Sequence, residues 1–218
     1  MKKIFVLTFI YFIIYACGPV GTKLQDAPDL KLAAKVPEDP DVKIGKLDNG
    51  LTYYIRNNKK PENRIEMLLV LNAGSVLETD DQQGLAHFVE HMGFNGTENF
   101  PKQELVEYLE SIGMDFGPDL NAYTSFDETV YMLQVPSDDA DKLEKGFQIL
   151  SDWAHNMSFE DEEIDKERGV VIEEWRLRGG AWKRMIDQQL PVILKDSKYA
   201  DRLPIGQKAV IDTFHYET

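Results

Sequence analysis

Residues 84–94 read GLAHFVEHMGF, and this stretch decides what the rest of the chain must support. Its apolar residues follow the i, i+3, i+4, i+7 spacing of a helix and form one stripe: Leu85, Phe88, Val89 and Met92. The opposite arc carries His87, Glu90 and His91. The stretch therefore predicts an amphipathic helix whose polar side consists of groups that bind metals or transfer protons.

The two histidines are four residues apart, so His87 and His91 can present both imidazoles to one ion. Zinc suits this pair, because it accepts nitrogen ligands at about 2.0 to 2.1 Å and catalytic sites keep one position for water. Glu90 is adjacent to His91 and is better placed to reach a bound water, whose pKa a metal lowers toward about 7. The alternative is a solvated helix face that carries two histidines by chance.

A third ligand is available in residues 165–178, DKERGVVIEEWRLR. On a helix, Glu167 and Glu174 share a face because seven residues make about two turns, whereas Glu173 points about 100° away. One face of a second helix thus offers two carboxylates to the imidazoles of the first. The helical phase does not choose between them, and such a charge run also occurs on ordinary solvated helices.

The wider pattern predicts an α+β fold, with helices covering one face of a mostly antiparallel sheet. A hairpin is expected over 42–57, because Asn49-Gly50 tolerates a tight turn. The apolar strand 65–71 is expected deep in the sheet. Further strands are expected at 120–124 and 128–135. Helices are expected at 101–112, after Ser137, at 159–177 and at 181–194, and Ser158 is expected to cap the third of these.

The N-terminus has the layout of a secretory signal peptide over residues 1–16, with two lysines followed by an apolar run too short for a membrane span of about 20 residues. Cys17, the only cysteine, follows a stretch that resembles a bacterial lipobox and is expected to carry a lipid. Residues 17–41 would then form a tether. An ordinary signal peptide with an incidental cysteine is the alternative.

The 218 residues suffice for one domain with a hydrophobic core, and 43% apolar with 28% charged residues is typical of a globular protein. The formal net charge is -14, and no long run of Lys or Arg forms a basic patch. Nucleic acid is therefore excluded as the expected partner.

The chain resembles the pitrilysin or insulinase family of metallopeptidases, the M16 family, and most of all its bacterial zinc proteases. The resemblance rests on HFVEH with ERGVVIEEW, an inverted zinc motif, and extends through NAGSVLE, GLAHFVEHMGFNGT and NAYTSFDETVY. S-ribosylhomocysteine lyases carry a similar HxxEH on a related fold, but they complete their metal site with a cysteine, and Cys17 lies at the expected anchor. Peptide hydrolysis is the better interpretation.

The resemblance implies a zinc metalloendopeptidase that cleaves extended peptides or unfolded proteins, with one Zn²⁺ per chain. It makes His87, His91 and Glu174 the zinc ligands, Glu90 the general base, and Glu167 an acidic residue that supports the site. It also implies that Asn121, Ala122, Tyr123 and Thr124 form an open sheet edge on which the substrate adds as a strand. An ordinary edge strand is the alternative.

Residues 42–218 are then expected to form the N-terminal catalytic domain of such a protease, cut short at its C-terminal end. Further M16 domains would come from the same chain or a partner subunit. The protein is expected in the bacterial cell envelope as an exported lipoprotein, facing the periplasm or the cell exterior. A non-catalytic M16-like peptide-binding or partner subunit is the main alternative, and an envelope binding lipoprotein with a chance HFVEH is another.

Overall fold

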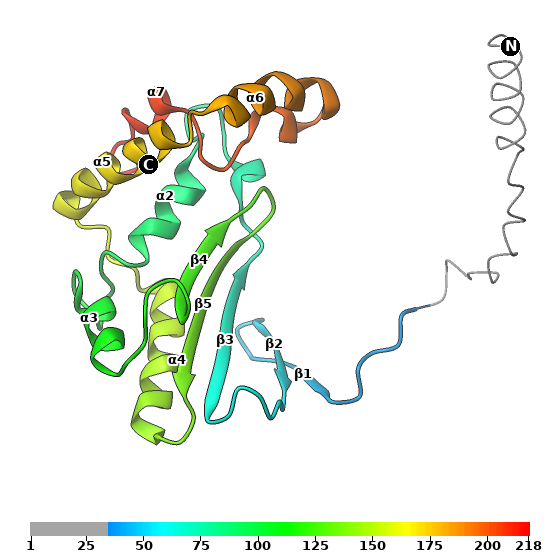
Figure 1. Cartoon of the computed structure of the whole chain (residues 1–218), viewed down its shortest axis with the longest axis vertical. Helices are drawn as coiled ribbons and strands as arrows, with labels where there is room; N and C mark the ends of the chain where they lie inside the picture. The colour runs from blue at the N-terminus through cyan, green and yellow to red at the C-terminus, as the bar shows by residue number, and fades with distance from the viewer. Residues whose placement is uncertain (1–34) are drawn as a thin grey trace, which may run out of the picture. The chain divides into compact units, whose positions relative to one another are not determined.

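The computed structural model describes residues 35–218 (Figure 1). The predicted signal peptide 1–16, Cys17 and most of the predicted tether lie outside the described residues. Residues 35–41, the described end of that tether, are exposed and contain no helix or strand. Within residues 35–218, no helix is long and apolar enough to span a membrane.

Residues up to Asn57 form a separate compact unit, whose described part contains the predicted hairpin. Strand β1 (Val42–Lys46) pairs antiparallel with β2 (Thr52–Arg56). Gly50 has a φ of 94°, which a residue with a Cβ rarely adopts, and the Asn49 side chain accepts a hydrogen bond from Leu51 N. The Asn-Gly turn is thus confirmed, and in the described residues the hairpin forms its own two-stranded sheet.

The second unit, Asn58–Thr218, is built on an antiparallel sheet in the order β3-β5-β4. Its strands are β3 (Arg64–Leu71), β4 (Leu120–Thr124) and β5 (Thr129–Pro136). The central strand is β5, so the expectation that residues 65–71 lie deep in the sheet is wrong. Leu68 and Val70 are 61% and 52% exposed. A nearly all-apolar run such as residues 65–71 does not by itself distinguish a strand buried on both faces from one with an open face.

The helices of this unit follow the predicted order. They are η1 (Ser75–Leu77), α2 (Leu85–Met92), α3 (Glu104–Ser111), α4 (Ala140–His155), α5 (Asp161–Leu177), α6 (Ala181–Ile193), η2 (Lys198–Asp201) and α7 (Lys208–Ile211). Asp139 caps α4 by accepting from the N–H groups of residues 141 and 142.

Two predicted helix starts are wrong by two or three residues. Helix α3 begins at Glu104 rather than Pro101, because Lys102 has a φ of 53°, outside the helical region. Helix α5 begins at Asp161, and Ser158 is not its cap. Before Asp161 the chain is tied to a distant segment: Met157 forms an antiparallel bridge with Thr97, and Ser158 N donates to Gly96 O.

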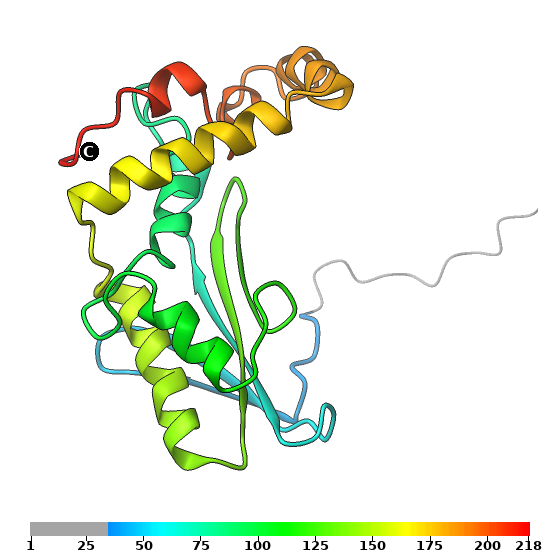
Figure 2. The same cartoon turned by 60° about the vertical axis from the view of Figure 1, so that its left-hand side comes forward.

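Helices α2, α3 and α4 lie on one face of the sheet, as Figure 2 shows for α3 and α4. The main apolar core lies between the central strand β5 and these helices. It contains Tyr131, Leu133 and Val135 of β5, Leu105 and Leu109 of α3, and Ile149 and Trp153 of α4. The α+β fold with helices over one face of an antiparallel sheet is therefore confirmed.

A second apolar cluster joins α2 to α5 and α7, and it positions the site. It consists of Phe88, Met92, Ile164, Val171, Ile211 and Phe214. Arg168 reinforces it by donating to Ile211 O and Phe214 O, at 2.6 and 2.9 Å. The apolar stripes of α2 and α5 meet here, where the two helices cross (Figure 2). This packing brings His87 and His91 of α2 close to Glu174 of α5.

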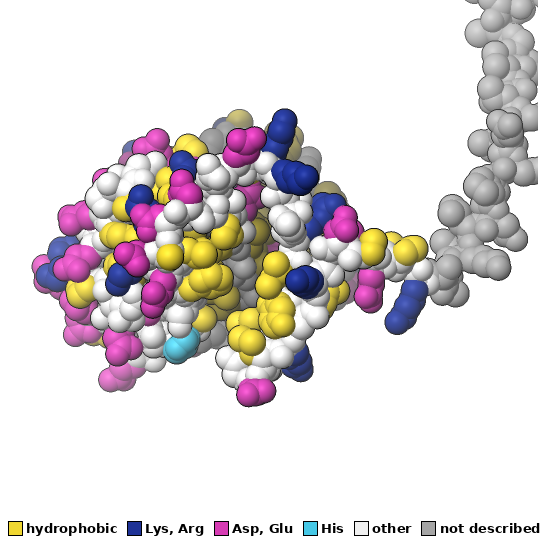
Figure 3. Space-filling model, turned by 90° about the horizontal axis from the view of Figure 1, so that it is seen from below, with side chains coloured by type: hydrophobic (Ala, Val, Ile, Leu, Met, Phe, Trp, Pro, Cys, Tyr) yellow, Lys and Arg dark blue, Asp and Glu magenta, His cyan; other side chains and the backbone are white. Residues whose placement is uncertain are grey.

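The surface is acidic, as the net charge of -14 predicts. On the face shown in Figure 3, Asp and Glu side chains are spread widely over the surface, with Lys and Arg between them. Such a surface favours solubility.

Candidate metal centre

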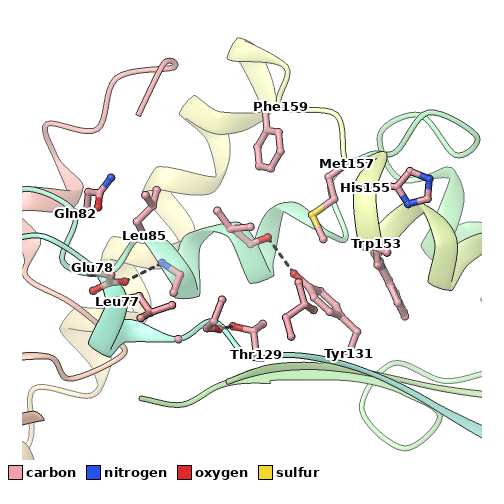
Figure 4. Close-up of a pocket in the computed structure, with 16 residues that line it drawn as sticks. Leu77, Glu78, Gln82, Leu85, Thr129, Tyr131, Trp153, His155, Met157 and Phe159 are labelled. Carbon is pink, nitrogen blue, oxygen red and sulfur yellow. Dashed lines mark hydrogen bonds between the residues drawn. The ribbon is translucent and has the colours of Figure 1, made fainter. Parts of the chain in front are cut away.

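Helix α2 carries three of the predicted site residues, and its start is held from outside the helix. Its N-cap, Gly84, has a φ of 101° and no side chain to accept the free N–H groups. The buried carboxylate of Glu78 does this instead, accepting from Gly84 N at 3.0 Å and Ala86 N at 2.9 Å. Figure 4 shows Glu78 beside this end of α2. The position of the helix along its axis is therefore fixed.

Figure 4 also shows a mostly apolar cavity of about 460 Å³ against α2. Leu85 and Val89 line it, and the hydroxyl of Tyr131 reaches Val89 O at 3.4 Å. The predicted functional side chains of α2 do not line this cavity. They line a second one.

The second cavity, of about 500 Å³, collects the predicted site residues from α2, α5 and β4. Its lining includes His87, Glu90, His91, Glu167, Glu174 and residues 121–124. Each predicted site residue within the described range is thus brought to one place. Cys17 lies outside the described residues.

Three of these side chains converge as metal ligands would. His87 Nε2 lies 3.6 Å from Glu174 Oε2, and His91 Nε2 lies 3.4 Å from the same oxygen. One donor atom from each of the three lies within 4.8 Å of the others. Ligands bound to zinc at about 2.0 to 2.1 Å in a tetrahedral arrangement are about 3.3 Å apart. The residues present therefore fit a zinc ion.

Glu167 does not join these three donors but fixes one of them. Its Oε1 lies 2.6 Å from His91 Nδ1, and its Oε2 accepts from Asn95 Nδ2 at 2.5 Å. Burial opposes the charge on Glu167, but the hydrogen bonds from His91 and Asn95 outweigh it and lower the pKa of this carboxyl. A carboxylate on Nδ1 directs Nε2 of His91 toward Glu174, the usual arrangement behind a metal-bound imidazole.

The two histidines have opposite proton affinities. Burial lowers the pKa of His87 to about 4, so its ring is neutral at pH 7. Burial also opposes the charge on His91, but the contacts with Glu167 and Glu174 outweigh it and raise the pKa of His91 to about 9. The contact with His91 lowers the pKa of Glu174 to about 2. A proton and a metal ion would thus compete for the same place between His91 and Glu174.

Glu90 is set apart from the metal donors and lies next to the strand. It is 8% exposed, and burial raises the pKa of its carboxyl. Thr124 of β4 donates a hydrogen bond to its Oε2 at 2.6 Å. Glu90 therefore lies between the metal donors and β4. Its raised pKa suits a general base, whose pKa should approach the working pH.

Strand β4 pairs with β5 on one side. On its other side, within residues 35–218, the structure has only an isolated bridge between Phe116 and Leu120, so no strand covers that edge. Ala122 N donates to the side chain of its neighbour Asn121, at 2.9 Å. Residues 121–124 also line the cavity. The edge is open to an added strand.

Three contributing residues were not predicted from the sequence. Asn95 holds Glu167, Glu78 holds the start of α2, and Arg178 forms an ion pair with Glu174. Arg178 follows Glu174 by four residues, so the helical spacing carried a signal for this pair. Asn95 lies beyond the end of α2 and contacts a residue of α5, so no such spacing identifies it. Glu78 gives no such signal, because its partner is a backbone end formed only on folding.

Comparison with known proteins identifies the family of this chain. Residues 53–198 match the family described as insulinase, peptidase family M16. A protein of Haemophilus influenzae named probable zinc protease PqqL is 40% identical over 213 residues, covering 98% of this chain and 22% of that protein. A protein of Arabidopsis thaliana named zinc protease PQQL-like is 46% identical over 167 residues, 77% of this chain and 18% of that one.

Among solved structures, the first half of the periplasmic protease PqqL from Escherichia coli matches with a TM-score of 0.80 and 40% identity. The match covers 84% of this chain and 39% of that one. The chain spans about a fifth of the length of the two curated relatives. By its sequence match and its fold, the chain belongs to the insulinase family of peptidases, M16.

Proposed function

We propose that this chain supplies the zinc-binding part of a metalloendopeptidase that hydrolyses peptide bonds in extended peptides or unfolded proteins. The observation that carries the proposal is the convergence of His87, His91 and Glu174 beside a separate buried carboxylate, Glu90. Two imidazoles and one carboxylate oxygen form a three-ligand set that leaves a position for water. One zinc ion per chain follows.

Each residue then has a distinct task. When bound, zinc supplies a water of lowered pKa and polarises the substrate carbonyl. Glu90 accepts the proton of the attacking water at its carboxylate and returns it to the leaving amine. Thr124 keeps one oxygen of Glu90 in place, and Glu167 keeps the ring of His91 in place.

The free edge of β4 is the proposed substrate site. An extended peptide paired with Asn121, Ala122, Tyr123 and Thr124 would run past Glu90, because Thr124 touches that carboxylate. Main-chain pairing binds extended peptides with little regard to sequence, which suits unfolded substrates. Hydrolysis would thus require a locally extended chain.

We also propose that residues 42–218 act together with further M16 domains, in the same chain or in a partner subunit. The Escherichia coli relative is described as periplasmic, which supports export of this protein to the cell envelope. Lipidation of Cys17, after removal of residues 1–16, and anchoring to a membrane complete the proposed arrangement.

Replacement of Glu90 by Gln tests the assigned chemistry. The E90Q variant should bind zinc like the wild type but lose peptidase activity by about 10²- to 10⁴-fold, the usual contribution of a general base. Activity is measured with the further M16 domains present, and zinc on the chain itself. E107Q, on an exposed face of α3, serves as the matched control and should be unaffected. Full activity of E90Q would contradict the role.

Metal analysis separates this proposal from the alternative of a non-catalytic M16-like partner subunit. Such a subunit binds peptides but needs no metal, and chelators would not change its peptide affinity. A wild-type chain that binds peptides and holds no zinc would support the alternative.

A further inference from the structure

The two oxygens of Glu174 face different partners. Oε2 faces the Nε2 atoms of His87 and His91, at 3.6 and 3.4 Å. Oε1 is paired with Nη2 of Arg178. One carboxylate is therefore shared between the metal donors on one side and a guanidinium on the other.

Arg178 is placed for this contact by the helix itself. It is the C-cap of α5, one turn beyond Glu174, and it lines the same cavity. The other charged side chains that line the cavity are histidines and glutamates, so Arg178 is the one lining residue with a guanidinium. The side chain of Glu174 is half-buried, with 27% exposed, whereas the side chain of Arg178 is 61% exposed.

The neighbouring arginine provides a comparison on the same helix. Arg176 pairs with Glu173, at 2.5 Å, and both side chains are more than half exposed. Neither residue lines the cavity. Ion pairs between exposed side chains contribute little to the stability of the folded protein. The contact of Arg178 differs because its partner is the proposed third zinc ligand.

The number of oxygens that Glu174 gives to the ion decides how many positions remain. One oxygen and two imidazole nitrogens leave the fourth tetrahedral position to water. A carboxylate that turned both oxygens to the ion would crowd that position. The ion pair between Oε1 and the Arg178 guanidinium opposes the turn, because it would have to break.

We propose that Arg178 is a positioning residue that restricts Glu174 to one-oxygen coordination and so keeps the water position open. The inference rests on the proposed zinc site and adds a residue that determines its coordination number. Arg178 acts through Glu174 and needs no contact with substrate.

Cobalt in place of zinc makes the coordination number visible. Tetrahedral Co²⁺ absorbs visible light much more strongly than Co²⁺ of higher coordination number. The purified full chain is loaded with Co²⁺, and the wild type is compared with R178A, R178K and the matched control R176A. Thermal unfolding monitored by circular dichroism identifies any variant that fails to fold.

The wild type and R176A should show the strong absorption of four-coordinate Co²⁺. R178A should keep one ion per chain but show weaker bands of a higher coordination number. R178K should restore the wild-type spectrum, because an ammonium can also hold Oε1. Assembled with the further M16 domains, R178A should lose peptidase activity by about 10- to 100-fold, the usual effect of a residue behind a ligand.

An unchanged spectrum of R178A would overturn the role of Arg178 and leave the zinc site intact. Loss of the ion from a folded R178A would also overturn it, because Arg178 would then be needed for binding rather than for coordination number. A wild-type chain that takes up neither Co²⁺ nor Zn²⁺ would instead contradict the proposed function.

Discussion

Glu167 Oε1 lies 2.6 Å from Nδ1 of His91 and so holds the ring whose other nitrogen faces Glu174. Two helices far apart in the sequence are thereby joined at one imidazole. The contact fixes which nitrogen of His91 is free for a metal.

The E167Q variant should therefore bind zinc about 10- to 100-fold more weakly than the wild type, because the ring loses its charged partner. Competition with a chromophoric zinc chelator measures the affinity. E173Q removes a carboxylate from an exposed position of the same helix and should leave it unchanged. Equal affinities for E167Q and E173Q would contradict the supporting role of Glu167.

Zinc binding should release a proton and strengthen as the pH rises toward about 9. The pKa of His91 is raised to about 9, and its Nε2 must lose a proton before it binds a metal. Calorimetry of zinc binding at pH 7.5 in buffers of different ionisation enthalpy counts the protons released. Binding without proton release would show that His91 is already neutral.

The same pKa predicts how the stability of the chelator-treated protein depends on pH. A pKa raised from 6.5 to about 9 on folding stabilises the folded state fully below pH 6.5, and this contribution is lost as the pH rises through 9. Urea unfolding between these pH values measures it. The pH dependence should be weaker in H91N, in which no group titrates at this position.

The hydroxyl of Thr124 should influence the acidic limb of the activity profile. Its hydrogen bond favours the ionised form of Glu90, whose pKa burial has raised. T124V should therefore raise this pKa further and shift the acidic limb of kcat/KM to higher pH, and T124S should keep the wild-type profile. A T124V profile that coincides with that of the wild type would remove the link between Thr124 and the base.

Glu78 should stabilise the helix that carries the histidines. In E78Q one oxygen is replaced by an NH₂ group that cannot accept, so one N–H at the start of α2 loses its partner. The expected loss is about 1–3 kcal/mol in the free energy of unfolding. Hydrogen exchange at Gly84 and Ala86 should be faster than in the control E107Q. Unchanged stability and exchange would contradict the capping role.

The grouping of the candidate site residues follows more directly from the sequence than the order of the strands in the sheet does. The stripe of α2 and the shared phase of Glu167 and Glu174 depend on local helix geometry, which the chain carries in its spacing. The helical phase alone did not distinguish Glu174 from Glu167. In the structure Glu174 faces Nε2 of both histidines, whereas Glu167 contacts only Nδ1 of His91. The family resemblance implied Glu174, and the packing of α2 on α5 places its carboxylate beside both histidines.

The misplaced strand and helix starts have tertiary causes. The apolar run at 65–71 fits an interior strand, yet β5 takes the centre and leaves Leu68 and Val70 exposed. Ser158 is a good cap residue in isolation, but its segment pairs with residues 96 and 97 and the helix begins only at Asp161. Such pairings join segments distant in sequence, so local propensity does not reveal them.

The most direct test is the metal content of the purified full chain, measured by inductively coupled plasma mass spectrometry after dialysis against metal-free buffer. The wild type and E173Q should each hold one zinc ion per chain, whereas H87A, H91A and E174Q should hold far less. A wild type without zinc, or an E174Q that keeps a full ion, would contradict the assignment of His87, His91 and Glu174 as a zinc site.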